Sequence, residues 1–218
     1  MEPSSTPRIH LVRHGEVHNP DGVLYGRLPG FRLSDRGRRM AALAADDLVA
    51  SGVRPGRLVV SPLQRTRESA EPVAEAFGLE PVVDERVIEP WNAFEGRVLG
   101  GRRGAWRSPA SWPLLARPWE PSWGEPFLEI VARMRAAIAE HARAAEEADV
   151  IVVTHQLPIW MMHRSVTGRP LRHNPARRRC ALSSITVLEP QPELGLREVD
   201  YREPAAALLA TAIDQGAV

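Results

Sequence analysis

The sequence predicts an α/β protein, a three-layer α/β/α sandwich with a mostly parallel central sheet. Short apolar runs with the flanking turn residues of buried strands occur at 8–13, 58–60 and 150–153. Segments with helical spacing or helix caps follow these runs, at 34–52, 62–77, 125–147 and 157–167. Strands that alternate with helices form a parallel or mixed sheet covered by helices on both faces. A hairpin of 184–188 and 196–201 closes the predicted sheet.

Cap residues set the predicted helix boundaries. Ser34 is a preferred N-cap residue, and the apolar residues behind it recur at helical spacing up to Ser51. Pro62 stands at a favoured helix-start position, and Gly78 is a typical residue just past a helix end. Gly168 closes the last of these helices in the same way. Two shorter segments are predicted to be extended, at 82–83 and 87–88.

The chain of 218 residues shows no internal repeat and no linker, so one domain is expected at 8–203. A disordered N-terminal end at 1–7 and a C-terminal tail at 204–218 flank this domain. The stretch at 91–125 is rich in Trp, Pro, Gly and Arg and has no regular pattern. It is predicted to be a lid or insertion, whose tryptophans either pack the core or form an apolar wall for the substrate.

Composition excludes several classes of function. The net charge of +1 gives no general electrostatic case for a nucleic-acid partner or for an anionic membrane. The single cysteine, Cys180, rules out an internal disulfide and fits a reducing compartment. The N-terminus has no apolar leader, and no apolar run reaches the ~20 residues that span a bilayer. We therefore expect a cytoplasmic protein, whereas its oligomeric state is not predicted.

Reactive side chains follow three of the predicted strands. Arg13 and His14 end the first strand, Ser61 begins the helix that carries Arg65, and His155 ends the strand at 150–153. The carboxyl ends of neighbouring parallel strands form the ligand site of open α/β sheets. Two guanidiniums and two imidazoles are therefore expected in one pocket. Arginine binds phosphoryl oxygens through its planar fork, and a histidine among such groups is a candidate nucleophile.

These motifs resemble the histidine phosphatase superfamily, also called the phosphoglycerate mutase-like fold. The likeness covers roughly 8–190 and rests on Arg13-His14-Gly15-Glu16, Leu33-Ser34-x-x-Gly37, Ser61-Pro62-Leu63-x-Arg65 and Thr154-His155. The resemblance implies that His14 attacks the phosphoryl group and becomes a phosphohistidine. It also implies that Arg13, Arg65 and His155 hold the phosphoryl oxygens. No metal and no cofactor is needed in that scheme.

The resemblance also implies a carboxylic acid that protonates the leaving oxygen and then activates water. Glu89 is the first choice, because in the family this acid lies shortly before a segment such as Phe94-Glu95-Gly96. The segment 89–95 is one residue shorter than the family's form and lacks its central glycine, so Glu85 and Glu95 remain alternatives.

Two further residues are predicted to bind the substrate. Asn19 stands one position closer to His14 than the family's phosphate-site asparagine. Gln156 replaces a glycine that commonly follows the second histidine, and its backbone N–H can still face the phosphate. Glu16 is expected to have a structural role. The arginines of the loop 169–179 form either a solvated face or a region that steers an anionic substrate.

The predicted function is a phosphomonoesterase that acts on a small phosphorylated metabolite. A phosphoglycerate mutase ranks lower, because the region around Glu89 lacks the mutases' Glu-Arg-His-Tyr-Gly segment. A non-catalytic module that binds a phosphorylated ligand and a metal-dependent hydrolase are further alternatives. His10, His14 and His18 share a four-residue spacing that fits a metal site, but the turn at Gly15 should separate His18 from the other two.

Overall fold

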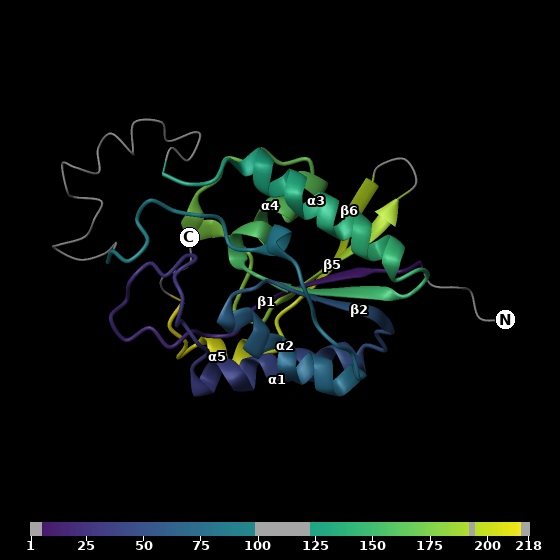
Figure 1. The fold of residues 1–218 in the computed structure, drawn as a ribbon, viewed down its shortest axis with the longest axis horizontal. Coiled ribbons are helices and arrows are strands. Elements are labelled where there is room, and N and C mark those ends of the chain that lie inside the picture. Colours follow the sequence, from purple (N-terminus) through teal and green to yellow (C-terminus); the bar gives the residue numbers. More distant parts are fainter. Residues whose placement is uncertain (1–5, 99–122, 192–194, 215–218) are drawn as a thin grey trace.

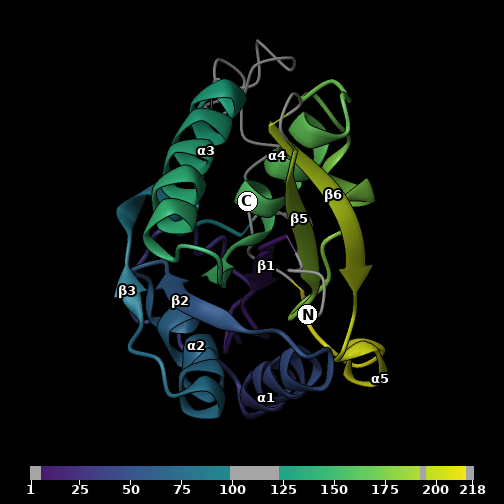
Figure 2. The same cartoon turned by 90° about the vertical axis from the view of Figure 1, so that its right-hand side faces the viewer.

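A computed structural model describes residues 6–98, 123–191 and 195–214 of the chain. Its centre is a six-stranded mixed sheet in the order β3-β2-β4-β1-β5-β6 (Figures 1 and 2). The strands are β1 (Ile9–Arg13), β2 (Pro55–Val60), β3 (Val82–Val83), β4 (Asp149–Thr154), β5 (Ile185–Gln191) and β6 (Gly195–Arg202). The first four strands are parallel to one another, whereas β5 and β6 run antiparallel to their neighbours. The predicted mostly parallel sheet and closing hairpin are confirmed.

Helices cover both faces of this sheet. The helices are α1 (Asp35–Ala50), α2 (Gln64–Phe77), α3 (Phe127–Ala144), α4 (Gln156–Val166) and the short α5 (Ala206–Leu209). Figure 1 shows α1, α2 and α5 on one side of the sheet and α3 and α4 on the other. The predicted three-layer sandwich is therefore confirmed. None of the described helices is long and apolar enough to cross a membrane.

The two apolar cores follow from the side-chain alternation of the strands. Successive strand residues point to opposite faces of a sheet. In β4, Val150 and Val152 pack with α3 and α4, whereas Ile151 and Val153 pack with α1 and α2. All four side chains are buried, which explains why the sequence of this strand is continuously apolar from 150 to 153 and does not alternate between apolar and polar residues.

The strand register brings the three sequence motifs to one edge of the sheet. Arg13 is the partner of Thr154 in the β1–β4 ladder, and the backbone N–H of His14 continues this ladder to the Thr154 carbonyl. In the β2–β4 ladder, Val60 pairs with Val153, and the N–H of Ser61 donates to the Val153 carbonyl. The residues that follow β1, β2 and β4 are therefore neighbours in space.

Several predicted boundaries differ from the observed ones. Helix α2 begins at Gln64 rather than 62, because Leu63 still has an extended backbone. The segment at 87–88 is not extended throughout, because Glu85–Val87 form a 3-10 turn that the Asp84 side chain caps. Most of the predicted lid, residues 99–122, lies outside the described residues, as does the N-terminal end at 1–5. The domain limits therefore stay predictions.

A close backbone contact fixes the loop that carries His14. The Ser34 hydroxyl caps α1 by accepting from the Gly37 N–H, and this first turn of α1 lies against the loop after β1. A Cβ atom on Gly37 would lie 2.0 Å from the Glu16 carbonyl oxygen, and one on Gly15 would lie 2.3 Å from the Gly37 carbonyl oxygen. Both positions therefore require glycine for space rather than for an unusual backbone angle.

We expect Gly37→Ala to lower the free energy of unfolding by about 3 kcal/mol, because two backbone segments must separate to admit the methyl group. Gly52→Ala is the matched control, since a Cβ there meets no neighbour and the residue has φ of 68°. The control should cost only about 1 kcal/mol, for the left-handed backbone alone. Urea unfolding measures both values, and equal losses would show that the α1 contact does not constrain the loop.

Candidate active site

His14 lies fully buried just beyond the end of β1. Its Nδ1 is 2.8 Å from the Gly15 carbonyl oxygen, which can only accept a hydrogen bond. Nδ1 therefore carries the proton, and the lone pair of the ring is on Nε2. Burial, with the Arg65 and Arg13 guanidiniums nearby, lowers the pKa of His14 well below its usual value. A lowered pKa favours the neutral imidazole, which is the form of histidine that can act as a nucleophile.

Two buried arginines stand beside this histidine. Nη1 of Arg13 donates to the Cys180 carbonyl at 2.6 Å, and both Nη atoms contact the Asp214 carboxylate. Burial opposes the charge of Arg13, but Asp214 outweighs this effect and the pKa of the guanidinium is raised. Arg65 lies at the start of α2, where its Nη2 donates to the Gly26 carbonyl at 2.7 Å. Both guanidiniums are thus held in fixed orientations by backbone carbonyls.

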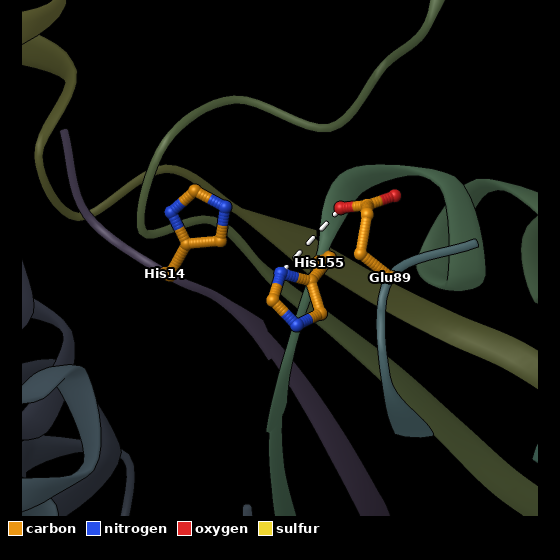
Figure 3. A group of neighbouring side chains, drawn as sticks. All are labelled: His14, Glu89 and His155. Atoms are coloured by element: carbon orange, nitrogen blue, oxygen red, sulfur yellow. Dashed lines mark ion pairs between the residues drawn. The ribbon is translucent and has the colours of Figure 1, made fainter. Parts of the chain in front are cut away.

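His155 faces His14 across the edge of the sheet. The two ring centroids are 5.3 Å apart, with the planes inclined at 64°. Nε2 of His155 shares a 2.7 Å hydrogen bond with the Ser61 hydroxyl, so the residue after β2 orients the residue after β4. Nδ1 of His155 points toward Glu89, and the dashed line in Figure 3 marks their 3.4 Å separation. Burial, then Arg65 and His14, lowers the pKa of His155 well below its usual value.

Glu89 is the carboxyl group that the structure places with both histidines (Figure 3). It is fully buried, and this burial raises its pKa despite the nearby Arg65 and Arg13 charges. The two alternatives lie elsewhere: Glu85 is exposed, and the Oε1 of Glu95 accepts from the backbone N–H groups of Arg27 and Asn92. Glu89 is therefore the one of the three with the environment of a general acid.

Several buried polar atoms of the site have no hydrogen-bond partner among the described residues. Within the described part of the chain, no hydrogen-bond partner exists for Arg13 Nε, His14 Nε2, Arg65 Nε, both Glu89 carboxyl oxygens and His155 Nδ1. The Glu89–His155 pair is close enough for an ion pair, but its geometry does not make a hydrogen bond. Buried polar groups are normally satisfied, and leaving one unsatisfied costs roughly 1–3 kcal/mol. Such a concentration of them indicates a site built for a polar ligand.

Comparison with known families assigns the chain. The model of the histidine phosphatase superfamily (branch 1) matches residues 9–199. The chain belongs to the histidine phosphatase superfamily. This membership confirms the family and the enzyme class, a phosphatase, that the strand-end motifs predict.

Relatives of this histidine phosphatase share most of its length. An uncharacterized protein of Mycobacterium tuberculosis is 46% identical over 199 residues, which cover 91% of this chain and 97% of that protein. Phosphoserine phosphatase 1 of Hydrogenobacter thermophilus is 30% identical, with 74% of this chain and 76% of that protein covered. A mycobacterial glucosyl-3-phosphoglycerate phosphatase, solved with inorganic phosphate, is 25% identical with a TM-score of 0.70. That match covers 92% of this chain and 99% of the solved one.

In this histidine phosphatase, one arginine ties the Glu89 segment to the loop 19–33. Nε of Arg27 donates to the Glu89 carbonyl at 2.5 Å, and Nη2 donates to Glu125 at 3.0 Å. Glu125 is also held by Arg133 of α3 at 2.6 Å. The backbone position of Glu89 therefore depends on a side chain from a loop more than sixty residues away in sequence.

The remaining predicted residues have other contacts. The Asn19 side chain bonds to the backbone of Val23 in both directions, and the Gln156 side chain accepts from Arg178 at 3.2 Å. Their roles in substrate binding stay predictions. Glu16 pairs with Arg36 at 3.0 Å, which fits the structural role expected for it.

Two contributors to the site were not singled out from the sequence. Nothing in the sequence separates Arg178 from the other arginines of its loop. In the structure Arg178 is partly buried, whereas the other arginines of the loop are exposed. It bonds to Gln156 and His173, and burial lowers its pKa to about 10 while the Glu89 carboxyl opposes that shift. Asp214 was part of an unassigned tail. No local pattern marks either residue, because each reaches the site only through the tertiary fold.

One group of residues has the composition of a metal site. Ligand atoms of His14, Glu89 and His155 lie within 4.8 Å of one another, which makes them the candidate metal ligands among the described residues. His10 and His18 do not belong to this group: His10 Nε2 lies 3.8 Å from Asp149, and His18 is exposed. The spacing of His10, His14 and His18 therefore does not correspond to a shared site.

We expect both active-site imidazoles to stay neutral between about pH 8 and about pH 6, where an ordinary histidine titrates. Arg65→Ala should raise the pKa of His14 and of His155, because a nearby positive charge is removed and water enters the site. Imidazole proton shifts in an NMR titration measure both values. Arg67→Ala, on the exposed face of the same helix, is the control and should leave them unchanged. Identical titrations in the two variants would contradict the electrostatic role of Arg65.

Proposed function

We propose that this histidine phosphatase is a metal-independent phosphomonoesterase that works through a phosphohistidine on His14. The observation that supports this most directly is the group of buried, unpartnered atoms of Arg13, His14, Arg65, Glu89 and His155. Two guanidinium Nε–H donors suit phosphoryl oxygens, a bare imidazole nitrogen suits phosphorus, and a protonated carboxyl suits a leaving oxygen. A bound phosphate monoester would satisfy these atoms together.

In the first step, the Nε2 lone pair of His14 attacks phosphorus as the bond from phosphorus to the ester oxygen breaks. Glu89 enters this step as a carboxylic acid, because burial raises its pKa, and gives its proton to the departing oxygen. The products are a free alcohol, a phosphohistidine and the Glu89 carboxylate. Arg13 and Arg65 offset the charge that develops on the phosphoryl oxygens, and His155 donates to one of them.

In the second step, Glu89 acts in the opposite direction. Its carboxylate takes a proton from water as the water oxygen attacks phosphorus and the phosphorus–nitrogen bond breaks. Inorganic phosphate leaves, His14 returns to its neutral form, and Glu89 is again protonated. We propose a small phosphorylated metabolite as the substrate, in keeping with the relatives named for phosphoserine and for glucosyl-3-phosphoglycerate.

The test of the nucleophile is hydrolysis of p-nitrophenyl phosphate in the presence of EDTA. Wild type should release phosphate at an unchanged rate in chelator, and the activity of His14→Ala should fall at least about 10³-fold, because the attacking imidazole nitrogen is removed. His18→Ala, an exposed histidine four residues away, is the control and should retain activity. An acid-labile, alkali-stable phosphoenzyme should be trapped in wild type and absent from His14→Ala.

Three further results would identify the alternative functions. Interconversion of 2- and 3-phosphoglycerate without phosphate release would identify a mutase instead. Loss of activity in EDTA, restored by added metal, would identify a metal-dependent hydrolase that uses the His14, Glu89 and His155 cluster. Binding of phosphorylated ligands with equal, negligible turnover in wild type and His14→Ala would identify a non-catalytic module.

A second test addresses Glu89. Because burial raises its pKa, kcat/KM of wild type should fall on the alkaline side as the carboxyl loses the proton that the leaving group needs. Glu89→Gln should lower kcat/KM for an alkyl phosphate by about 10²–10⁴-fold and remove this alkaline limb. The loss should be smaller for p-nitrophenyl phosphate, whose leaving group needs less protonation. Glu85→Gln, at an exposed position, is the control; the same profile in both variants would exclude Glu89 as the acid.

A further inference from the structure

The C-terminal segment reaches the phosphoryl pocket through a defined series of contacts. Leu208 and Leu209 of α5 pack on a small buried cluster formed by Met40, Leu182 and Ala205. After α5, the Thr211 carbonyl accepts a hydrogen bond from Arg36. Asp214 is thereby brought to Arg13, although 201 positions separate them in sequence.

Asp214 holds Arg13 by the end of its guanidinium. Oδ2 accepts from Nη1 at 2.8 Å and Oδ1 accepts from Nη2 at 2.5 Å, which is a bidentate arrangement. The Cys180 carbonyl takes a further Nη1 hydrogen. Nε and the second Nη2 hydrogen lie on the other edge of the guanidinium, and the buried Nε has no partner among the described residues.

We propose that Asp214 is a positioning residue for phosphoryl binding. It fixes the guanidinium of Arg13 by one edge so that the Nε edge faces the phosphoryl oxygens. This inference rests on the proposed function, since it assigns a task to Arg13 in the same site. Asp214 acts through Arg13 and touches no reacting atom.

The charges around the pocket support this assignment. Burial lowers the pKa of Arg65 and of Arg178, and the nearby Arg13 charge lowers both further, whereas burial raises the pKa of Glu89. Without a carboxylate, the free enzyme would bury repelling guanidiniums with little compensation. Asp214 supplies that negative charge while its side chain remains 39% exposed, outside the buried cluster of His14, Glu89 and His155. It can therefore stay in place when the substrate binds.

The experiment compares Asp214→Ala, Asp214→Asn and Asp214→Glu with wild type. Asp46→Asn, an exposed position on α1, is the control that removes the same charge elsewhere. Steady-state kinetics with p-nitrophenyl phosphate give kcat and KM, and calorimetric titration with inorganic phosphate gives Kd without turnover. Thermal unfolding of each variant detects a purely structural effect.

Asp214→Ala should raise both KM and the phosphate Kd by about tenfold, because one charge-assisted contact at the phosphoryl group loses its alignment. We expect kcat to fall as well, because Arg13 also offsets the charge that develops on the phosphoryl oxygens during the reaction. Asp214→Asn should have an intermediate effect, Asp214→Glu should restore most of the affinity, and Asp46→Asn should match wild type.

Tighter phosphate binding in Asp214→Ala would overturn the proposal and make Asp214 a competitor for the phosphoryl site. An unchanged Kd and KM, with or without a lower melting temperature, would reduce it to a structural contact. Either result is distinguishable from failure of the proposed function, which would appear as an inactive wild type or as full activity in His14→Ala.

Discussion

The parallel pairing of β1 with β4 is the constraint on which the site depends. Because Arg13 and Thr154 are partners in that ladder, the residues that follow them emerge side by side at the same edge of the sheet. The centroids of the two imidazole rings that follow these strands are 5.3 Å apart. A register shift of one residue in either strand would send one histidine to the opposite face of the sheet. The apolar runs before the motifs are therefore as necessary for the site as the motifs themselves.

Burial of the site shifts the pKa values of its side chains and also lowers the stability of the free protein. Burial lowers the pKa of His14 and raises that of Glu89, and it leaves several polar atoms of the site without a hydrogen-bond partner among the described residues. Preorganised groups of this kind strengthen the stabilisation of a developing charge, because they need no rearrangement during the reaction. The free protein is correspondingly less stable than one with a fully satisfied pocket, and a bound phosphate would recover part of that difference.

The sequence predicted those features of the fold and site that depend on residues close together along the chain. Apolar runs, caps and glycines predicted the main helices and strands, and the ends of two strands predicted that Arg13, His14 and His155 lie close together. Glu89 was harder to place, because the segment around it departs from the family's pattern, and its burial against His155 is what separates it from Glu85 and Glu95. Arg178 and Asp214 had no local signal, since packing of distant segments alone brings them to the pocket.

The link from Arg27 to the Glu89 carbonyl has a consequence for how specificity can diverge in this protein. A loop that surrounds a substrate usually varies freely, because it contributes contacts but no scaffold. Here, remodelling the segment around Arg27 would also displace Glu89, the proposed general acid. New substrates are therefore more accessible through substitutions that retain this arginine than through insertions or deletions in its loop, and turnover and selectivity are expected to change together when it is lost.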